Sequence, residues 1–142
     1  YAVKQLGWDC TALDPDSRTI EHIAEFIGVK TIQGDFMRVN NPVRYDIITF
    51  NRVLEHVDDP VLMLKRSKDF LADNGIVYIE VPDGEEASKA GFEREEFTYD
   101  HPHVFSLTSL SILAIKAKLK ILKLQRGIDP SGKFSLWAFA GN

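Results

Sequence analysis

The sequence predicts an α/β fold with a mostly parallel sheet, and three observations lead to that prediction. Short apolar stretches rich in β-type residues alternate with stretches of helical periodicity, as in sheets whose parallel strands are joined by helices. The stretch at residues 76–81 is apolar almost throughout, which is typical of a strand covered by helices on both faces. Two strands near the C-terminus are separated by the turn-rich segment 129–132, so we expect an antiparallel hairpin at the edge of the sheet.

Residues 45–60, YDIITFNRVLEHVDDP, are central to this prediction because a buried strand ends there in polar side chains. The β-type run stops at Asn51 and Arg52, and a short turn follows. Asp59 then has the form of an N-cap, with Pro60 at the first position of a new helix. Open α/β sheets place ligand groups where their strands end, so a site is expected beside Asn51 and Arg52.

The chain before this stretch predicts two helices and two strands. Gly7 and Gly28 follow helical patterns, and each is expected to close a helix in the left-handed conformation that glycine adopts readily. Asp16 or Ser17 is expected to cap the helix between them. The expected elements are a helix end at residues 1–6, a strand at 8–13, a helix that ends at Gly28, and a strand at 29–33.

The chain after this stretch predicts further alternation. A helix of about three turns begins at Pro60, includes Phe70 and Leu71, and is expected to stop at the turn signal of residues 73–75. Ser106 is expected to cap the last helix. The remaining elements are a strand at 76–81, a mobile loop or broken helix at 85–99, and closing strands at 119–126 and 133–139.

Composition excludes several classes of function. The 142 residues carry a formal net charge of -4 without a dense basic stripe, so a nucleic acid is not expected as a partner. No apolar run approaches the roughly 18 residues that a membrane span needs. Cys10 is the single cysteine, which fits a reducing compartment. We therefore expect a cytoplasmic protein of one domain that does not contact a membrane.

Two acidic residues end the first two expected strands. In a doubly wound sheet an acid placed like Asp14 can accept both hydroxyls of a ribose, although it can equally cap the helix after Pro15. Asp35 can receive an exocyclic amine such as that of adenine, and Phe36 offers a flat face to a ring. The alternative for this second pair is a turn aspartate beside a core phenylalanine.

The segment YDHPH at residues 99–103 is the densest cluster of polar and aromatic side chains. His101 and His103 flank a proline, and they can supply a general base near neutral pH, with loop packing as the alternative. A His-x-His pair without a nearby cysteine is a weak metal signal, so no metal ligand is predicted. Glu55 and His56 are adjacent, so on a helix they would face different directions.

With these residues placed, the chain resembles the class I S-adenosylmethionine-dependent methyltransferases, notably the branch that includes many small-molecule and sugar methyltransferases. The resemblance runs from residue 1 to about residue 141. Its most specific segments are YDIITFNRVLEHVDDP and LADNGIVYIEVP, which are similar to that branch's fourth strand, helix and fifth strand. It implies a Rossmann-like three-layer sandwich, S-adenosylmethionine as cofactor and a small-molecule acceptor.

The resemblance also implies roles for residues at the cofactor. LGWDCTALDPD is similar to the family's second strand, whose terminal acid binds the cofactor ribose, and this role falls to Asp14. IQGDF is similar to the third-strand motif, which puts Asp35 at the adenine amine and Phe36 beside the ring. The expected cofactor-binding residues are Asp14, Pro15, Asp35, Phe36, Asn51 and Arg52.

The acceptor site is implied by a further similarity. DHPHVFS resembles a signature that the family carries before its fifth helix, near the acceptor. By this resemblance His101 is the base that removes the acceptor's proton, with Tyr99 or His103 orienting the acceptor. The sequence does not identify the acceptor, nor whether oxygen, nitrogen or carbon is methylated.

One part of the family pattern is not found in this sequence. The family's first strand and its glycine-rich loop, which cradles the methionine end of the cofactor, are expected just before residue 1. That strand would pair between the strands at residues 8–13 and 45–50, which leaves two strand edges without this partner. We therefore expect a single methyltransferase-like domain, residues 1–142, that is incomplete at its N-terminus.

Two other functions are open at this point. A methyltransferase-like module without activity would bind or form a homodimer through an exposed sheet edge, which the missing glycine loop favours and the two cofactor acids disfavour. A nicotinamide-dependent oxidoreductase would carry an acid like Asp14 on a similar sheet. The closing hairpin suits a methyltransferase better.

Overall fold

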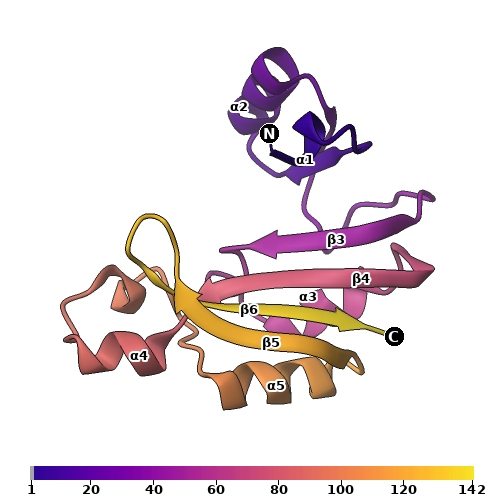
Figure 1. Ribbon diagram of the computed structural model, residues 1–142. Helices are drawn as coiled ribbons and strands as arrows, with labels where there is room; N and C mark the ends of the chain where they lie inside the picture. The colour runs from indigo at the N-terminus through magenta and orange to yellow at the C-terminus, as the bar shows by residue number, and fades with distance from the viewer. Residues whose placement is uncertain (1) are drawn as a thin grey trace. The chain divides into compact units, whose positions relative to one another are not determined.

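The computed structural model describes residues 2–142 and divides into two compact units, Tyr1–Asn41 and Pro42–Asn142 (Figure 1). The first unit holds a small sheet with its helices, and the second holds a larger sheet. The assignment of residues 1–142 to one domain stays a prediction. Among the described residues, no helix is both long and apolar enough to cross a bilayer.

The first unit is a two-stranded parallel sheet with helices before and between the strands. β1 and β2 pair in parallel, with Asp14 opposite Gln33. Gly7 and Gly28 have φ angles of +78° and +66°, so both predicted glycine caps are confirmed, although Tyr1 lies outside the described residues. The elements are α1 (Ala2–Gln5), β1 (Thr11–Asp14), α2 (Ser17–His22), a π-helical turn η1 (Ile23–Ile27) and β2 (Lys30–Gln33).

The second unit is built on a four-stranded sheet. Its strands are β3 (Tyr45–Asn51), β4 (Leu71–Pro82), β5 (Lys120–Ile128) and β6 (Phe134–Gly141), in the spatial order β3-β4-β6-β5. β3 and β4 are parallel, whereas β6 runs antiparallel to both β4 and β5. The predicted α/β class, with one antiparallel strand supplied by the closing hairpin, is therefore confirmed.

Two helices of the second unit, α3 and α5, start at the predicted capping residues Asp59 and Ser106. Asp59 accepts a hydrogen bond from the backbone N–H of Leu62 at 2.8 Å, and Ser106 forms a reciprocal capping box with Ser109. α3 packs against α5, and α5 packs against β5 (Figure 1). The helical elements are α3 (Pro60–Ser67), α4 (Gly84–Lys89), a 3-10 turn η2 (Glu95–Phe97) and α5 (Leu107–Lys116).

The core of this unit lies between the sheet and the helices α3 and α5. Side chains of β4 and β6 that point to the helical side alternate with half-buried ones, as expected for a pleated strand. The fully buried apolar side chains include Leu54, Leu64, Val77, Ile79, Leu110 and Leu136. Because this core fixes the ends of β3 and β4, it also fixes the residues that follow them.

The predicted end of the helix after Pro60 is wrong. α3 ends at Ser67, and Leu71 already belongs to β4, where it pairs with Tyr45. The turn signal at residues 73–75 marks an irregularity inside β4, because the register then moves to Ile47 opposite Ile76. A Cβ atom on Gly75 would lie 2.9 Å from the carbonyl oxygen of Tyr45, so this close approach of two strands requires glycine.

The acidic segment at residues 85–99 contains helical pieces, so the broken-helix alternative is confirmed. Asp83 caps α4 by accepting hydrogen bonds from the backbone N–H groups of Glu85 and Glu86 at 3.1 and 3.3 Å. The chain then forms η2, in which Glu96 is buried. This segment leads directly into the loop that carries His101.

Candidate functional site

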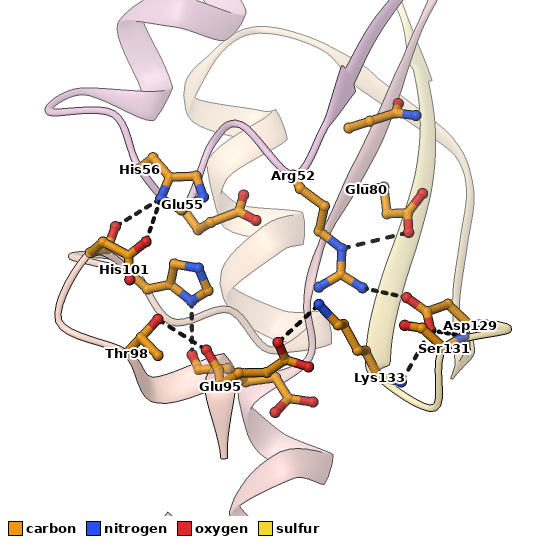
Figure 2. Close-up of a pocket in the computed structure, with 13 residues that line it drawn as sticks. Arg52, Glu55, His56, Glu80, Glu95, Thr98, His101, Asp129, Ser131 and Lys133 are labelled. Atoms are coloured by element: carbon orange, nitrogen blue, oxygen red, sulfur yellow. Dashed lines mark hydrogen bonds and ion pairs between the residues drawn. The ribbon is translucent and has the colours of Figure 1, made fainter. Parts of the chain in front are cut away.

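A pocket of about 600 Å³ lies in the second unit, where β3 and β4 end (Figure 2). The turn after β3, the loop that follows α4 and the β5–β6 turn form its walls. Arg52 and Lys133 are its basic side chains, and Lys133 is paired with Glu95 at 2.9 Å. The acidic side chains that line the pocket are Glu55, Glu80, Glu95, Glu96, Asp100 and Asp129. This excess of carboxylates makes the pocket favourable for a cationic group.

Arg52 connects the end of β3 to both neighbouring walls. Its Nε atom lies 3.7 Å from Glu80 Oε1, and its guanidinium donates to Asp129 Oδ2 at 3.0 Å and also to the Ser135 hydroxyl. Its φ angle of +54° is in the left-handed region, which costs a non-glycine residue about 1 kcal/mol or more. The side chain's three polar contacts offset this strain, so Arg52 is a structural brace at the edge of the pocket.

Glu80 is held from a second side by Tyr78. The Tyr78 hydroxyl donates a hydrogen bond to Glu80 Oε2 at 3.0 Å. Burial, with this bond and the charge of Glu80, raises the pKa of Tyr78 to about 12. Tyr78 therefore stays a neutral donor at physiological pH, and the Glu80 carboxylate is fixed between Tyr78 and Arg52.

The turn after β3 brings a buried carboxyl group to the pocket. Glu55 is 1% exposed, and neither of its carboxylate oxygens has a hydrogen-bond partner among the described residues. Burial raises the pKa of this carboxyl. His103 stabilises this turn, since its backbone N–H donates to Glu55 O at 3.4 Å and its ring Nε2 lies 2.8 Å from Val57 O.

Two histidine rings are in contact at the same wall of the pocket. The rings of His56 and His101 are packed edge to face, with 4.7 Å between their centroids. His56 Nδ1 lies 2.8 Å from the carbonyl oxygen of Asp100, and His101 Nδ1 lies 3.2 Å from that of Glu96. Because a carbonyl oxygen only accepts, each Nδ1 is the donor in these contacts, and in the neutral form of each ring the lone pair is on Nε2.

The loop that carries His101 is anchored by an ion pair between the buried carboxylate of Glu96 and the partly exposed Arg94. Glu96 is 2% exposed, and its two oxygens accept hydrogen bonds from Arg94 at 3.0 and 2.9 Å. Burial acts to raise the pKa of Glu96, but Arg94 and the Phe134 backbone N–H outweigh burial, so the pKa is lowered. The Arg94 guanidinium also lies 4.8 Å from the centre of the Phe134 ring.

The structure brings some of the predicted site residues together in this pocket. Asn51, Arg52 and His101 line it. Tyr99 does not line the pocket, because its side chain is fully exposed. His103 does not line it either, because its ring is hydrogen-bonded to the turn after β3. The catalytic roles predicted for Tyr99 and His103 have no support from this arrangement, whereas His101 stays a candidate.

The other predicted residues lie in the first unit. Asp14 is the last residue of β1, and its Oδ1 accepts a hydrogen bond from the Asp16 backbone N–H at 2.8 Å. Asp35 follows β2 and accepts similarly from the Met37 N–H at 2.8 Å. Pro15 is exposed and Phe36 is half-buried. Each carboxylate thus has one oxygen fixed by a backbone amide, as the turn alternative for Asp35 predicts. The helix-cap alternative for Asp14 is wrong, because Asp16 caps α2. The roles of Asp14 and Asp35 toward a cofactor stay predictions.

Several residues that line the pocket were not predicted as site residues, among them Glu55, His56 and Glu96. Glu55 and His56 are not on a helix, so their expected divergence is wrong, and the turn directs both side chains to the wall that His101 forms (Figure 2). Glu96 belongs to an acidic stretch without readable periodicity. Its arginine partner two residues earlier is the one local signal that could have indicated burial.

The chain belongs to the family described as "Methyltransferase domain", whose pattern matches residues 2–124. This match spans both compact units and includes β1 to β4. No curated protein sequence matches the chain.

Solved structures of methyltransferases share the fold. The 1,6-didemethyltoxoflavin-N1-methyltransferase of Burkholderia thailandensis has a TM-score of 0.70 and 17% identity, over 98% of this chain and 63% of that one. A TehB-like SAM-dependent methyltransferase of Corynebacterium glutamicum gives 0.71 and 13%, over 99% and 72%. The O-methyltransferase NcsB1 from neocarzinostatin biosynthesis gives 0.65 and 19%, over 93% and 42%. At these identities the similarity establishes the fold alone.

Proposed function

We propose that this chain transfers a methyl group from S-adenosylmethionine to a small-molecule acceptor. The match to a methyltransferase domain over residues 2–124 is the observation that carries the proposal. The structure of the Burkholderia enzyme contains 1,6-didemethyltoxoflavin and S-adenosylhomocysteine, and that of NcsB1 contains S-adenosylhomocysteine and 1,4-dihydroxy-2-naphthoic acid. The chain spans 63% of the Burkholderia protein, so the activity of the whole enzyme is a proposal for this chain.

The charge of the pocket fits the cofactor that this reaction uses. S-adenosylmethionine carries a positive sulfonium and supplies a methyl group. The acceptor's nucleophile would attack the methyl carbon in line with the carbon–sulfur bond, which breaks to release S-adenosylhomocysteine. Six carboxylates and two basic side chains line the pocket, so its field favours a cation. The chain's contribution is then to hold the acceptor and the methyl group in line and to exclude water.

In the first unit, we assign the adenosine part of the cofactor to the ends of β1 and β2. Asp14 would accept the ribose hydroxyls and Asp35 the adenine amine, with Pro15 and Phe36 beside the nucleoside. The backbone amides that hold one oxygen of Asp14 and Asp35 support this assignment, because they fix the orientation of each carboxylate before a ligand binds.

In the second unit, we assign proton removal from the acceptor to His101. Its Nδ1 donates to Glu96 O, so Nε2 keeps the lone pair that a base needs. The ion pair of Glu96 and Arg94 holds this tautomer in place. Asn51 and Arg52 border the same pocket at the end of β3.

Calorimetric titration of S-adenosylhomocysteine into the 142-residue chain tests the cofactor assignment. We expect binding at about micromolar Kd, and we expect Asp14→Asn to weaken it by about 10- to 100-fold, since a charge-assisted hydrogen bond contributes about 1.5–3 kcal/mol. Asp9→Asn is the matched control, because Asp9 pairs with Lys30 on the surface of the same unit. Absence of binding by the wild-type chain would contradict the proposal.

Turnover of the His101→Ala variant tests the acceptor side. We expect turnover to fall by about 10²- to 10⁴-fold, the usual contribution of a positioned base, while S-adenosylhomocysteine affinity stays the same. His22→Gln in the first unit is the control and should retain turnover. If the wild-type chain bound the cofactor product yet methylated no acceptor, the inactive binding module would replace this proposal.

A further inference from the structure

We propose that Glu55, His56 and His101 form a binding site for a divalent transition-metal ion, represented by Zn²⁺. This site would bind its ion whether or not the chain transfers methyl groups. One ligand atom from each of the three residues lies within 4.8 Å of the others. The residues come from the turn after β3 and from the loop before α5, so the fold brings together side chains that are far apart in sequence (Figure 2).

The buried carboxyl of Glu55 is the strongest indication of a ligand. A buried polar group without a partner is costly, and native structures nearly always satisfy such groups. Glu55 is 1% exposed, and both of its oxygens are without a hydrogen-bond partner in the described part of the chain. A bound cation at the two neighbouring histidines would satisfy this carboxylate.

The two histidines are already oriented as metal ligands usually are. A ligating imidazole typically donates its second N–H to a carbonyl or carboxylate, which fixes its tautomer and ring orientation. His56 and His101 make this contact through Nδ1, with Asp100 O at 2.8 Å and Glu96 O at 3.2 Å. The Asp100 carboxylate lies 3.9 Å from the same nitrogen of His56. Both Nε2 lone pairs are therefore available to an ion.

The donor set selects the kind of ion. Two imidazoles and one carboxylate suit Zn²⁺ and similar transition ions, whereas Mg²⁺ and Ca²⁺ prefer oxygen ligands throughout. Ligand atoms at about 2.0–2.2 Å from a tetrahedral Zn²⁺ lie roughly 3.3–3.6 Å apart, so a pair at the 4.8 Å limit would have to approach by about 1 Å on binding. Three protein ligands leave a fourth position toward the pocket for water or an acceptor oxygen.

An ion at this position would change the role of His101. A ligated Nε2 cannot accept a proton, so the acidity of an oxygen acceptor would come from its bond to the ion. His101 would then position the ion as one of its ligands. His101→Ala would therefore lower turnover whether His101 is a base or a metal ligand. A chelator distinguishes the two cases, because it would lower the turnover of the ion-dependent enzyme and leave a His101 base unaffected.

Calorimetric titration of Zn²⁺ into the chelator-treated chain tests the site directly. We expect one site per chain with a Kd of about 1 μM or tighter, and no binding of Mg²⁺ under the same conditions. Glu55→Gln and His56→Gln should each weaken Zn²⁺ binding by at least about 10- to 100-fold, since even an outer partner of a metal ligand contributes that much. Glu55→Gln removes a buried charge and retains the side-chain shape, so we expect this variant to fold.

His22→Gln is the matched control, because His22 is one of the chain's four histidines and does not belong to the cluster. Co²⁺ provides a second measurement, since its visible absorption should report imidazole coordination in the wild type and lose it in His56→Gln. Absence of Zn²⁺ binding, or binding that follows His22 and is unchanged in Glu55→Gln, would overturn the proposal. Failure of S-adenosylhomocysteine to bind would not affect these titrations, so the two proposals fail separately.

Discussion

Replacement of Arg94 by methionine is expected to destabilise the protein clearly, because it leaves the buried Glu96 carboxylate without its charged partner. Glu96 is 2% exposed and accepts two hydrogen bonds from Arg94. In the variant its carboxylate would keep the Phe134 backbone N–H at 3.2 Å as a partner. Thermal unfolding followed by circular dichroism should show a Tm lower by several degrees.

The pH dependence of this loss identifies its cause. The pKa of Glu96 is lowered below its ordinary value of 4.5, so the pair stabilises the fold above that pH and loses its contribution as pH falls through the folded-state pKa. The deficit of Arg94→Met should therefore be complete at neutral pH and shrink in acid. Arg18→Met is the control, because its pair with Asp16 at 2.7 Å is exposed and should contribute little to stability at any pH. A deficit that is independent of pH would contradict this explanation.

Replacement of Arg126 by methionine is the second large effect that we expect, about 1–3 kcal/mol, because it leaves a buried carboxylate without its partner while solvent screens part of the lost interaction. Arg126 Nε lies 3.1 Å from Asp83 Oδ2, and Asp83 is fully buried while it caps α4. Arg126 also pairs with Glu85 at 2.6 Å and with Glu86. Its removal would leave three carboxylates close together at the start of one short helix, with no arginine among them. Chemical denaturation would measure the loss as a lower midpoint.

A double-mutant cycle separates the buried charge from the rest of this cluster. Asp83→Asn keeps an oxygen that can cap α4 and removes the charge, so we expect it to cost less than Arg126→Met. Burial raises the pKa of Asp83, so its protonated form is favoured in the fold and its ionisation lowers stability as pH rises above 3.8. The Arg126→Met/Asp83→Asn double variant should therefore recover part of the loss. A strictly additive cycle would show that the two residues do not interact.

The limits of helices and strands could be predicted where the signal is local. Asp59, Ser106 and Gly28 act on backbone groups within a few residues, so the sequence is sufficient to identify them as caps. The end of α3 is different, because Phe70 and Leu71 have helical spacing but are equally suitable for the start of a buried strand. The choice depends on Tyr45, which pairs with Leu71 across the sheet and lies far away in the chain.

The residues of the candidate site also differ in whether local sequence signals can indicate them. His101 belongs to a dense polar segment and Arg52 ends an apolar strand, so both could be singled out from the sequence. Glu55 and Glu96 could not, because their importance comes from burial, which tertiary packing decides. Glu96 meets the backbone of Phe134 38 positions later, and no spacing rule in the sequence predicts that contact.

The β5–β6 turn makes one wall of the pocket separable from the rest of the fold. Asp129, Ser131 and Lys133 line the pocket, while the strand ladder on either side is closed by Ile128 opposite Phe134. Lengthening a surface turn costs little, about 0.6 kcal/mol for each doubling. The length of this hairpin can therefore change without disturbing the pairing of β6 with β4. Such a change would alter the size of the pocket while the sheet that supports it stays the same.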